Sequence, residues 1–203
     1  MNCSILLVLS LLAHGTLLST GNQEVPAMES QPKIPKGSRI VILGDSLAEG
    51  MAAPFHKLAK KNGYIPVISA LHGTRIDYWS SRIEGVMVNS RPKLVVVSLG
   101  TNDSGLSNPE SQRIHVKKIR TTVEKYGGRI LWLSPMKLPA RFRGQDGIRK
   151  IIQEELSPQD VLASTDLKLE MIKDGVHLTG KGYENWIKIV WNRLVSEGYL
   201  INR

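Results

Sequence analysis

The sequence predicts an α/β fold in which helices cover both faces of an open parallel sheet. Short apolar runs alternate along the chain with longer stretches whose apolar residues recur at helical spacing. The short runs are continuously apolar, which is typical of strands that are buried on both faces, as in parallel sheets. Right-handed crossovers between such strands would give a three-layer α/β/α sandwich around a five-stranded sheet.

Five short runs are the candidate strands. They span residues 40–43, 65–70, 94–99, 130–134 and 161–164. The third run is the strongest because it contains Val95, Val96 and Val97, whose branched side chains favour strands. The fifth run is the weakest of the set.

Four stretches have helical spacing, and they cover residues 55–62, 110–126, 144–156 and 180–196. The first follows Pro54, a residue that favours the first turn of a helix. The second places Ile114, Ile119 and Val123 on one apolar side. We find no internal repeat and no low-complexity segment.

The N-terminal region has a different composition. Residues 1–21 contain no Asp, Glu, Lys or Arg, and their apolar run ends in small residues up to Gly21. This pattern predicts a signal peptide and a secreted or periplasmic protein. Because the segment before the apolar run lacks Lys and Arg, an uncleaved N-terminal anchor is the alternative. Residues 22–37 are proline-containing and polar, which predicts a flexible linker before a domain over 38–203.

Overall composition excludes several classes of protein. Hydrophobic residues make up 41% and charged residues 22% of the 203 residues, which is ordinary for a globular domain and excludes collagen and coiled coil. The single cysteine, Cys3, excludes an internal disulfide and a cysteine-based zinc site. The net charge of +9 suggests anionic partners without choosing among nucleic acid, an acidic glycan and a membrane surface.

Polar segments follow four of the predicted strands. They are Gly44-Asp45-Ser46-Leu47, His72-Gly73-Thr74, Gly100-Thr101-Asn102-Asp103 and Asp174-Gly175-Val176-His177. In an open α/β sheet the site lies at the carboxyl ends of the strands. We therefore expect these four segments to meet at one edge of the sheet.

This set resembles the SGNH, or GDSL, hydrolase family. The four residue types that name the family are present in order as Ser46, Gly73, Asn102 and His177, and the resemblance covers about residues 39–196. It implies a flavodoxin-like fold and a serine esterase. The nucleophile segment is not Gly-x-Ser-x-Gly, which argues against an α/β-hydrolase proper.

The chemistry explains why these residue types occur together. A serine hydroxyl becomes a nucleophile when a base takes its proton, and His177 is the natural base for Ser46. Asp174, three residues earlier, can orient the ring and stabilise the imidazolium. The resemblance assigns the oxyanion hole to the backbone N–H groups of Ser46 and Gly73 and to the side-chain amide of Asn102.

Each of these residues also has a purely structural interpretation. Ser46 or Asn102 could only cap a helix, and Gly73 or Asp174 could only form a turn. We expect Asp45 and Asp103 to be structural, bonding loop N–H groups.

Substrate binding is predicted from one basic segment and one aromatic residue. Residues 137–150 contain five basic residues and a single acidic one, Asp146. We expect Arg141 or Arg143 to help bind an anionic substrate. Trp79 could form a stacking wall for a sugar ring, although the sequence slightly favours core packing for it.

Small acyl esters, acetyl first, are the expected substrates, on glycans or other anionic carriers. The alternatives are a lysophospholipase or thioesterase of the same family, and a non-catalytic glycan-binding protein. We expect no cofactor, no metal site and no nucleic-acid partner. A membrane contact is expected only if residues 1–21 are uncleaved, and a monomer is the expected state.

Overall fold

The computed structural model describes residues 32–201. The predicted signal peptide or anchor, and residues 22–31 of the predicted linker, lie outside the described residues. The last part of that linker is packed, because Ile34 is buried and its N–H donates to the carbonyl of Tyr199 at 2.8 Å. Of the helices within residues 32–201, none has the length and apolar character to cross a membrane.

The sheet contains all five predicted strands. These are β1 (Arg39–Gly44), β2 (Ile65–Ala70), β3 (Leu94–Ser98), β4 (Arg129–Leu133) and the two-residue β5 (Val161–Leu162). They pair in the order β2-β1-β3-β4-β5, and every pairing is parallel. The predicted α/β class and the flavodoxin-like strand order are confirmed.

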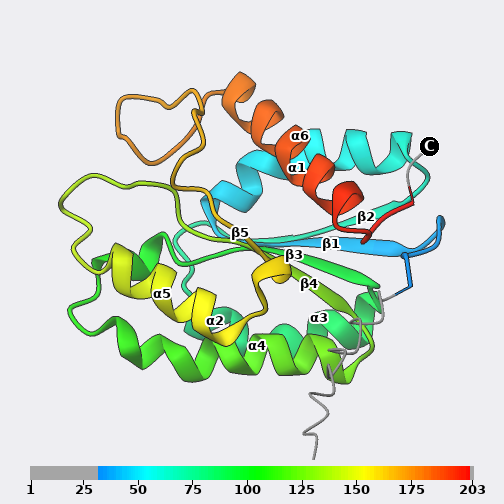
Figure 1. The fold of residues 1–203 in the computed structure, drawn as a ribbon, viewed down its shortest axis with the longest axis horizontal. Coiled ribbons are helices and arrows are strands. Elements are labelled where there is room, and N and C mark those ends of the chain that lie inside the picture. The colour runs from blue at the N-terminus through cyan, green and yellow to red at the C-terminus, as the bar shows by residue number, and fades with distance from the viewer. Residues whose placement is uncertain (1–31, 202–203) are drawn as a thin grey trace, which may run out of the picture. The chain divides into compact units, whose positions relative to one another are not determined.

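Helices cover the sheet on both faces (Figure 1). One face carries α1 (Ser46–Lys61) and α6 (Gly180–Ser196). The other carries α2 (Ile76–Ser80), α3 (Ile83–Ser90), α4 (Arg113–Lys125) and α5 (Gln145–Glu155). Three short 3₁₀ helices lie in the connections: η1 (Asn102–Gly105), η2 (Pro109–Gln112) and η3 (Pro158–Asp160).

The two faces bury separate halves of the core. Along β1, Ile40 and Ile42 pack into the cluster beneath α1 and α6, whereas Val41 and Leu43 pack into the other one. This alternation follows from the two-residue period of a strand. Both clusters are apolar, which explains why the strand is continuously hydrophobic in sequence.

Helix α1 begins nine residues earlier than the predicted start at residue 55. Pro54, which we expected in the first turn, lies inside the helix. The start is fixed instead by Asp45, whose side chain accepts a hydrogen bond from the N–H of Leu47. Leu47, Met51 and Phe55 then recur at four-residue spacing on the buried side, and this packing outweighs the cost of the proline.

Helices α2 and α3 were not predicted. Their buried residues Ile76, Trp79, Ile83 and Met87 do recur at three- and four-residue spacing. A turn at Ser81 and Arg82 divides them into helices of five and eight residues, too short for a periodic pattern to be distinguished from a loop.

Strand β2 is less buried than its apolar sequence predicts, since Ile65 and Ile68 are 47% and 40% exposed. It is one of the two edge strands, and its one partner in the sheet is β1. The helices therefore cover it incompletely, and the expectation that both faces of every strand are covered is wrong here.

The end of β1 meets the end of β3 at Gly44, which pairs with Ser98. A Cβ atom on Gly44 would lie 2.1 Å from the carbonyl oxygen of Ser98, so a larger residue does not fit without movement. Strands β2 and β3 lie on opposite sides of β1, so the connections that follow β1 and β3 lead to opposite sides of the sheet. Open α/β sheets place their binding crevice beyond the carboxyl ends of two such strands.

Candidate active site

Ser46 is the first residue of α1 and follows directly on β1. The preceding residue, Asp45, is the N-cap, and its Oδ1 accepts from the N–H of Leu47 at 3.0 Å. This arrangement presents the Ser46 side chain at the carboxyl end of β1, beside the N–H groups of the first helical turn. Those groups favour negative charge nearby.

Ser46, His177 and Asp174 form a continuous hydrogen-bonded chain. Ser46 Oγ lies 2.8 Å from His177 Nε2, and His177 Nδ1 lies 2.7 Å from Asp174 Oδ2. The three residues come from positions up to 131 apart in the sequence, and the structure brings them together as predicted. With the proton on Nδ1 held by Asp174, Nε2 can accept the proton of the serine hydroxyl.

The carboxylate of Asp174 is held by further bonds. Its Oδ1 accepts from the N–H groups of Val176 at 2.8 Å and His177 at 2.9 Å. These bonds and the contact with the His177 ring favour the ionised form and lower the pKa of Asp174 to about 2. Asp174 is therefore negatively charged throughout the neutral range.

The loop that carries Asp174 and His177 is closed at its base. The N–H of Ile172 donates to the carbonyl of His177 at 2.9 Å, and Met171 forms an antiparallel bridge with Leu178. These contacts hold the acid and the base in a short turn just before α6. The two side chains remain partly exposed, at 39% for Asp174 and 38% for His177, so substrate can reach the ring.

Gly73 lies in the turn after β2 with a φ of +70°, a conformation that glycine adopts without strain. The N–H of its neighbour His72 donates to Glu49 Oε1 at 2.9 Å, which ties this turn to α1. Gly73 also lines a depression of about 470 Å³. The other residues lining it are His72, Thr74, Arg75, Asp77 and Tyr78.

Asn102 is the first residue of η1, after β3, and its side chain joins two neighbouring loops. The amide Nδ2 donates to the carbonyl of Thr74 at 2.9 Å and to Asp45 Oδ2 at 3.2 Å. An amide nitrogen has two hydrogens, so both have acceptors within the protein. If Asn102 donated to an oxyanion, one of these two hydrogen bonds would have to break. The bond to Asp45 is longer and therefore weaker, so it would break more easily.

Asp45 and Asp103 are fully buried behind these loops. Burial raises the pKa of each carboxyl to about 7, although N–H groups of Leu47 and Ile76 oppose the shift. Asp103 accepts from the N–H of Ile76 with both oxygens at 3.3 Å. Both residues bond backbone N–H groups, as predicted.

Trp79 lies in the core rather than on the surface. It is 7% exposed, and its Nε1 donates to Thr74 Oγ1 at 2.8 Å. The ring therefore supports the turn that carries Gly73 and presents no face to a sugar. The structure agrees with core packing, which the sequence slightly favours, and the alternative of a stacking wall is wrong.

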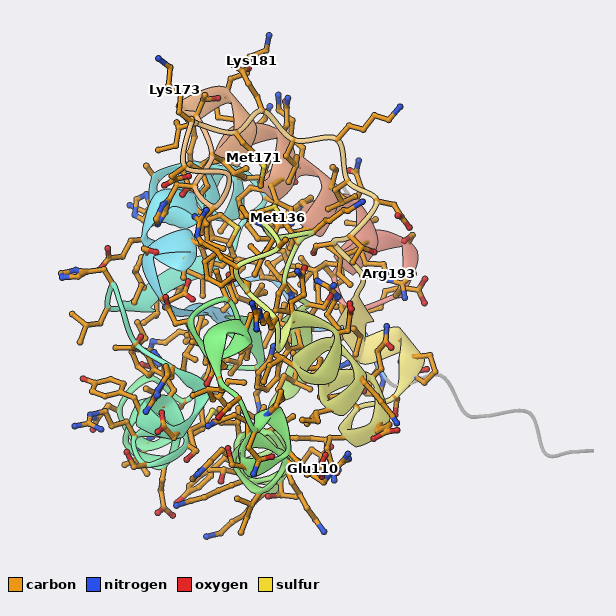
Figure 2. All side chains as sticks on the ribbon, turned by 90° about the vertical axis from the view of Figure 1, so that its left-hand side faces the viewer. Glu110, Met136, Met171, Lys173, Lys181 and Arg193 are labelled. Atoms are coloured by element: carbon orange, nitrogen blue, oxygen red, sulfur yellow. The ribbon has the colours of Figure 1, made fainter. Side chains whose placement is uncertain are left out.

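The basic segment divides into two parts. Arg141 lies beside the turn that carries Asp174, since its Nη2 donates to the main-chain carbonyl of Asp174 at 2.9 Å, and Arg143 is exposed on the same loop. Arg149 is used structurally, bonding the carbonyl of Met136 at 3.0 Å and the side chain of Gln145. Figure 2 looks onto the end of the sheet where the strands finish, and there Met136 lies near the centre and Lys173 projects outward.

Comparisons with known proteins identify the family and the fold of this chain. A family model described as "Protein of unknown function (DUF459)" matches residues 39–156, which is more than half of the chain. The chain belongs to this family. The match includes Ser46, Gly73 and Asn102 and ends before Asp174 and His177. A search of curated proteins finds no match.

Solved structures similar to this DUF459 protein share its fold at low sequence identity. TesA is 19% identical with a TM-score of 0.65, and the match covers 78% of this chain and 99% of TesA. The acetylxylan esterase Axe2 from Geobacillus stearothermophilus is 14% identical with a TM-score of 0.66, covering 84% and 100%. A GDSL-like lipase from Bacteroides thetaiotaomicron is 22% identical with a TM-score of 0.62, covering 82% and 92%. The SGNH fold predicted from the motifs is confirmed.

Two residues of the DUF459 site were not found from the sequence. Glu49 and Thr74 hold the turn around Gly73, Glu49 through the His72 N–H and Thr74 through Asn102. Glu49 lies three residues after Ser46, so its place in the first turn of a helix starting at Ser46 was available as a signal. Because the sequence predicted that this helix starts at residue 55, Glu49 was not placed in its first turn. Within residues 32–201, no group of three His, Cys, Asp or Glu side chains could hold a metal ion.

Proposed function

We propose that this protein is a serine esterase that acts through an acyl-Ser46 intermediate. The observation that carries the proposal is the chain of contacts from Ser46 Oγ to His177 Nε2 at 2.8 Å and from His177 Nδ1 to Asp174 Oδ2 at 2.7 Å. A solvent-accessible serine that contacts a base, which in turn contacts a carboxylate, is the arrangement needed for nucleophilic catalysis.

The reaction follows from the positions of these groups. Ser46 Oγ attacks the ester carbonyl while its proton passes to His177 Nε2, and the carbonyl oxygen becomes an oxyanion. The N–H groups of Ser46 and Gly73 and the amide of Asn102 stabilise that charge. As the bond to the alcohol breaks, His177 returns its proton to the alcohol oxygen. Water then attacks the acyl-enzyme with the same base, releasing the acid and Ser46.

Small acyl groups, acetyl first, are the substrates we propose. The depression beside Gly73 is open and is lined by the turn after β2 together with the first residues of α2, which suits a short acyl group better than a long chain. The fold similarity to acetylxylan esterases supports the same choice and makes an acetylated glycan a reasonable carrier.

Hydrolysis of a series of nitrophenyl esters tests the proposal and the acyl preference together. Wild type should hydrolyse the acetate, and Ser46→Ala should lose the activity while remaining folded. A steep fall in kcat/KM beyond butyrate is expected. A rise with longer chains would favour a lysophospholipase or thioesterase instead. No hydrolysis of any ester would favour a glycan-binding protein on a hydrolase fold.

We also propose that the protein acts after export as a monomer, with no nucleic-acid partner. The proposal rests on the uncharged apolar segment within residues 1–21. Mass spectrometry of the protein recovered from cells would test it, since cleavage after Gly21 gives a mature chain that begins at Asn22.

A further inference from the structure

The loops around the site carry very different charges. The loop 134–144, after β4, contains Lys137, Arg141 and Arg143 and no acidic residue. All three are exposed, and among the described residues none of them forms an ion pair. On the loop that carries Gly73, by contrast, Arg75 is paired with Asp77 at 3.1 Å. Unpaired positive charge therefore lies on the loop 134–144 and, beside it, on the exposed Lys173 of the turn that carries Asp174, which forms no ion pair among the described residues either.

This basic loop lies against the turn that holds the catalytic base. Arg141 Nη2 donates to the main-chain carbonyl of Asp174 at 2.9 Å. Pro139 approaches the same turn so closely that a Cβ on Gly175 would lie 3.0 Å from its ring. Because Arg141 bonds a carbonyl rather than a carboxylate, its charge is not neutralised by that contact. Its guanidinium group has five N–H donors, and the carbonyl takes one of them.

The chemistry decides which half of the ester faces this loop. His177 must give its proton to the alcohol oxygen as the C–O bond breaks, so the alcohol lies on the His177 side of Ser46. Arg141 is on that side because it contacts the residue that orients His177. The turn around Gly73, with its paired charges, is left for the acyl half.

We propose that the alcohol half of the substrate carries a carboxylate or phosphate group that Arg141 recognises. The inference rests on the esterase function proposed above and specifies its substrate class: esters of small acids with anionic alcohols. A guanidinium group suits this role because two of its N–H groups can bond two oxygens of one anion. Arg143 and Lys137 add to the positive potential around that position.

Matched aryl acetates test the charge and its location. Para-acetoxybenzoate and para-acetoxyphenyl phosphate carry the charge on the alcohol, and para-acetoxybenzamide is the neutral comparison. Phenyl hydrogen succinate carries the charge on the acyl half, with phenyl butyrate as its neutral comparison. Wild type should prefer the anionic alcohols by about tenfold in kcat/KM, which corresponds to ~1.4 kcal/mol. It should show no such preference for the succinate.

The variants separate the charge of Arg141 from its hydrogen bond. Arg141→Gln keeps a donor for the Asp174 carbonyl and removes the charge, so the preference for anionic alcohols should fall to about one. Arg141→Lys should keep most of it. Lys93→Gln removes the same charge at an exposed position just before β3, at the opposite end of the parallel sheet from the site, and should leave the preference intact. In wild type the preference should also weaken as salt rises from about 0.01 M to about 1 M.

The outcomes distinguish a failure of this inference from a failure of the proposed esterase function. Hydrolysis with equal rates on charged and neutral alcohols overturns this inference and leaves the esterase function standing. Equal loss on both substrates in Arg141→Gln also overturns it and makes Arg141 a positioning residue for Asp174. No hydrolysis of any ester by folded protein overturns the esterase function, and this inference with it.

Discussion

The side-chain amide of Asn102 donates a 3.2 Å hydrogen bond to the buried carboxylate of Asp45. The side chain that we propose as an oxyanion donor, in η1 after β3, is thus coupled to the N-cap residue of α1, the helix that begins at Ser46. A second bond, from Asn102 to the Thr74 carbonyl, adds the turn that carries Gly73. The segments that carry the three proposed oxyanion donors are therefore linked by one hydrogen-bond network at the carboxyl ends of β1, β2 and β3.

Asp45 should make the protein's stability depend on pH. Burial raises its pKa to about 7 from 3.8, so the folded state holds a proton that the unfolded chain releases. The stabilisation is complete below about pH 4 and is lost as pH rises towards 7. Asp45→Asn can still cap α1 but cannot ionise, so the fall in unfolding free energy over this range should become shallower. Urea denaturation at a series of pH values measures it.

The slope of the unfolding free energy against pH distinguishes the ionisation of Asp45 from a simple loss of packing. Asp103 has a raised pKa of the same size and should keep part of the slope in Asp45→Asn. Ser46→Ala, which leaves both carboxyls in place, should retain all of it. An unchanged slope in Asp45→Asn would contradict the assignment.

Replacing Asp174 should impair chemistry more than binding. Asp174→Asn removes the charge that stabilises the imidazolium and weakens the contact that holds the ring tautomer. We expect kcat to fall on the order of 10²-fold or more while KM changes little. Steady-state kinetics on an aryl acetate measures both. A fall of less than about threefold would mean that other groups orient His177.

Glu49 should act as a positioning residue for the oxyanion hole. It touches neither Ser46 nor the reacting atoms, but accepts the N–H of His72 next to Gly73. Glu49→Ala should lower kcat by about tenfold because the Gly73 turn loosens. Glu49→Gln keeps an acceptor oxygen and should restore most of the rate. If both variants behave alike, the hydrogen bond has no role in positioning.

Gly44 should tolerate no larger residue. A Cβ there would lie 2.1 Å from the Ser98 carbonyl oxygen, so Gly44→Ala should destabilise the fold by about 1–3 kcal/mol. Gly85, inside α3, is the matched control because nothing lies within 4 Å of an added Cβ. Gly85→Ala should stabilise the protein by about 0.5–1 kcal/mol. Equal effects of the two changes in thermal unfolding would contradict the packing argument.

The positions of the strands along the chain and the residues of the candidate site could be predicted because each is a local pattern. An apolar run that ends in a polar, catalysis-capable segment identifies both a strand and its carboxyl end. Ser46, Asn102 and His177 were found in this way. The start of α1 was predicted wrongly because a proline preference was given more weight than the cap and buried stripe that precede Pro54.

The supporting contacts could not be predicted because they depend on tertiary structure. Nothing in the sequence near Trp79 indicates that its indole nitrogen bonds Thr74, or that Asn102 reaches the Thr74 carbonyl. Likewise Arg141 and Arg149 look alike in the basic segment. Only the fold shows that one contacts the Asp174 turn and the other the carbonyl of Met136.

The most direct test of the central claim is the site of covalent labelling by a fluorophosphonate. The reagent should phosphonylate Ser46, and peptide mass mapping should find the adduct on the segment that begins α1. Ser46→Ala should show no adduct, and His177→Ala should react much more slowly because the base is missing. Failure of folded wild type to react, or an adduct on a different serine, would contradict the assignment of Ser46 as the nucleophile.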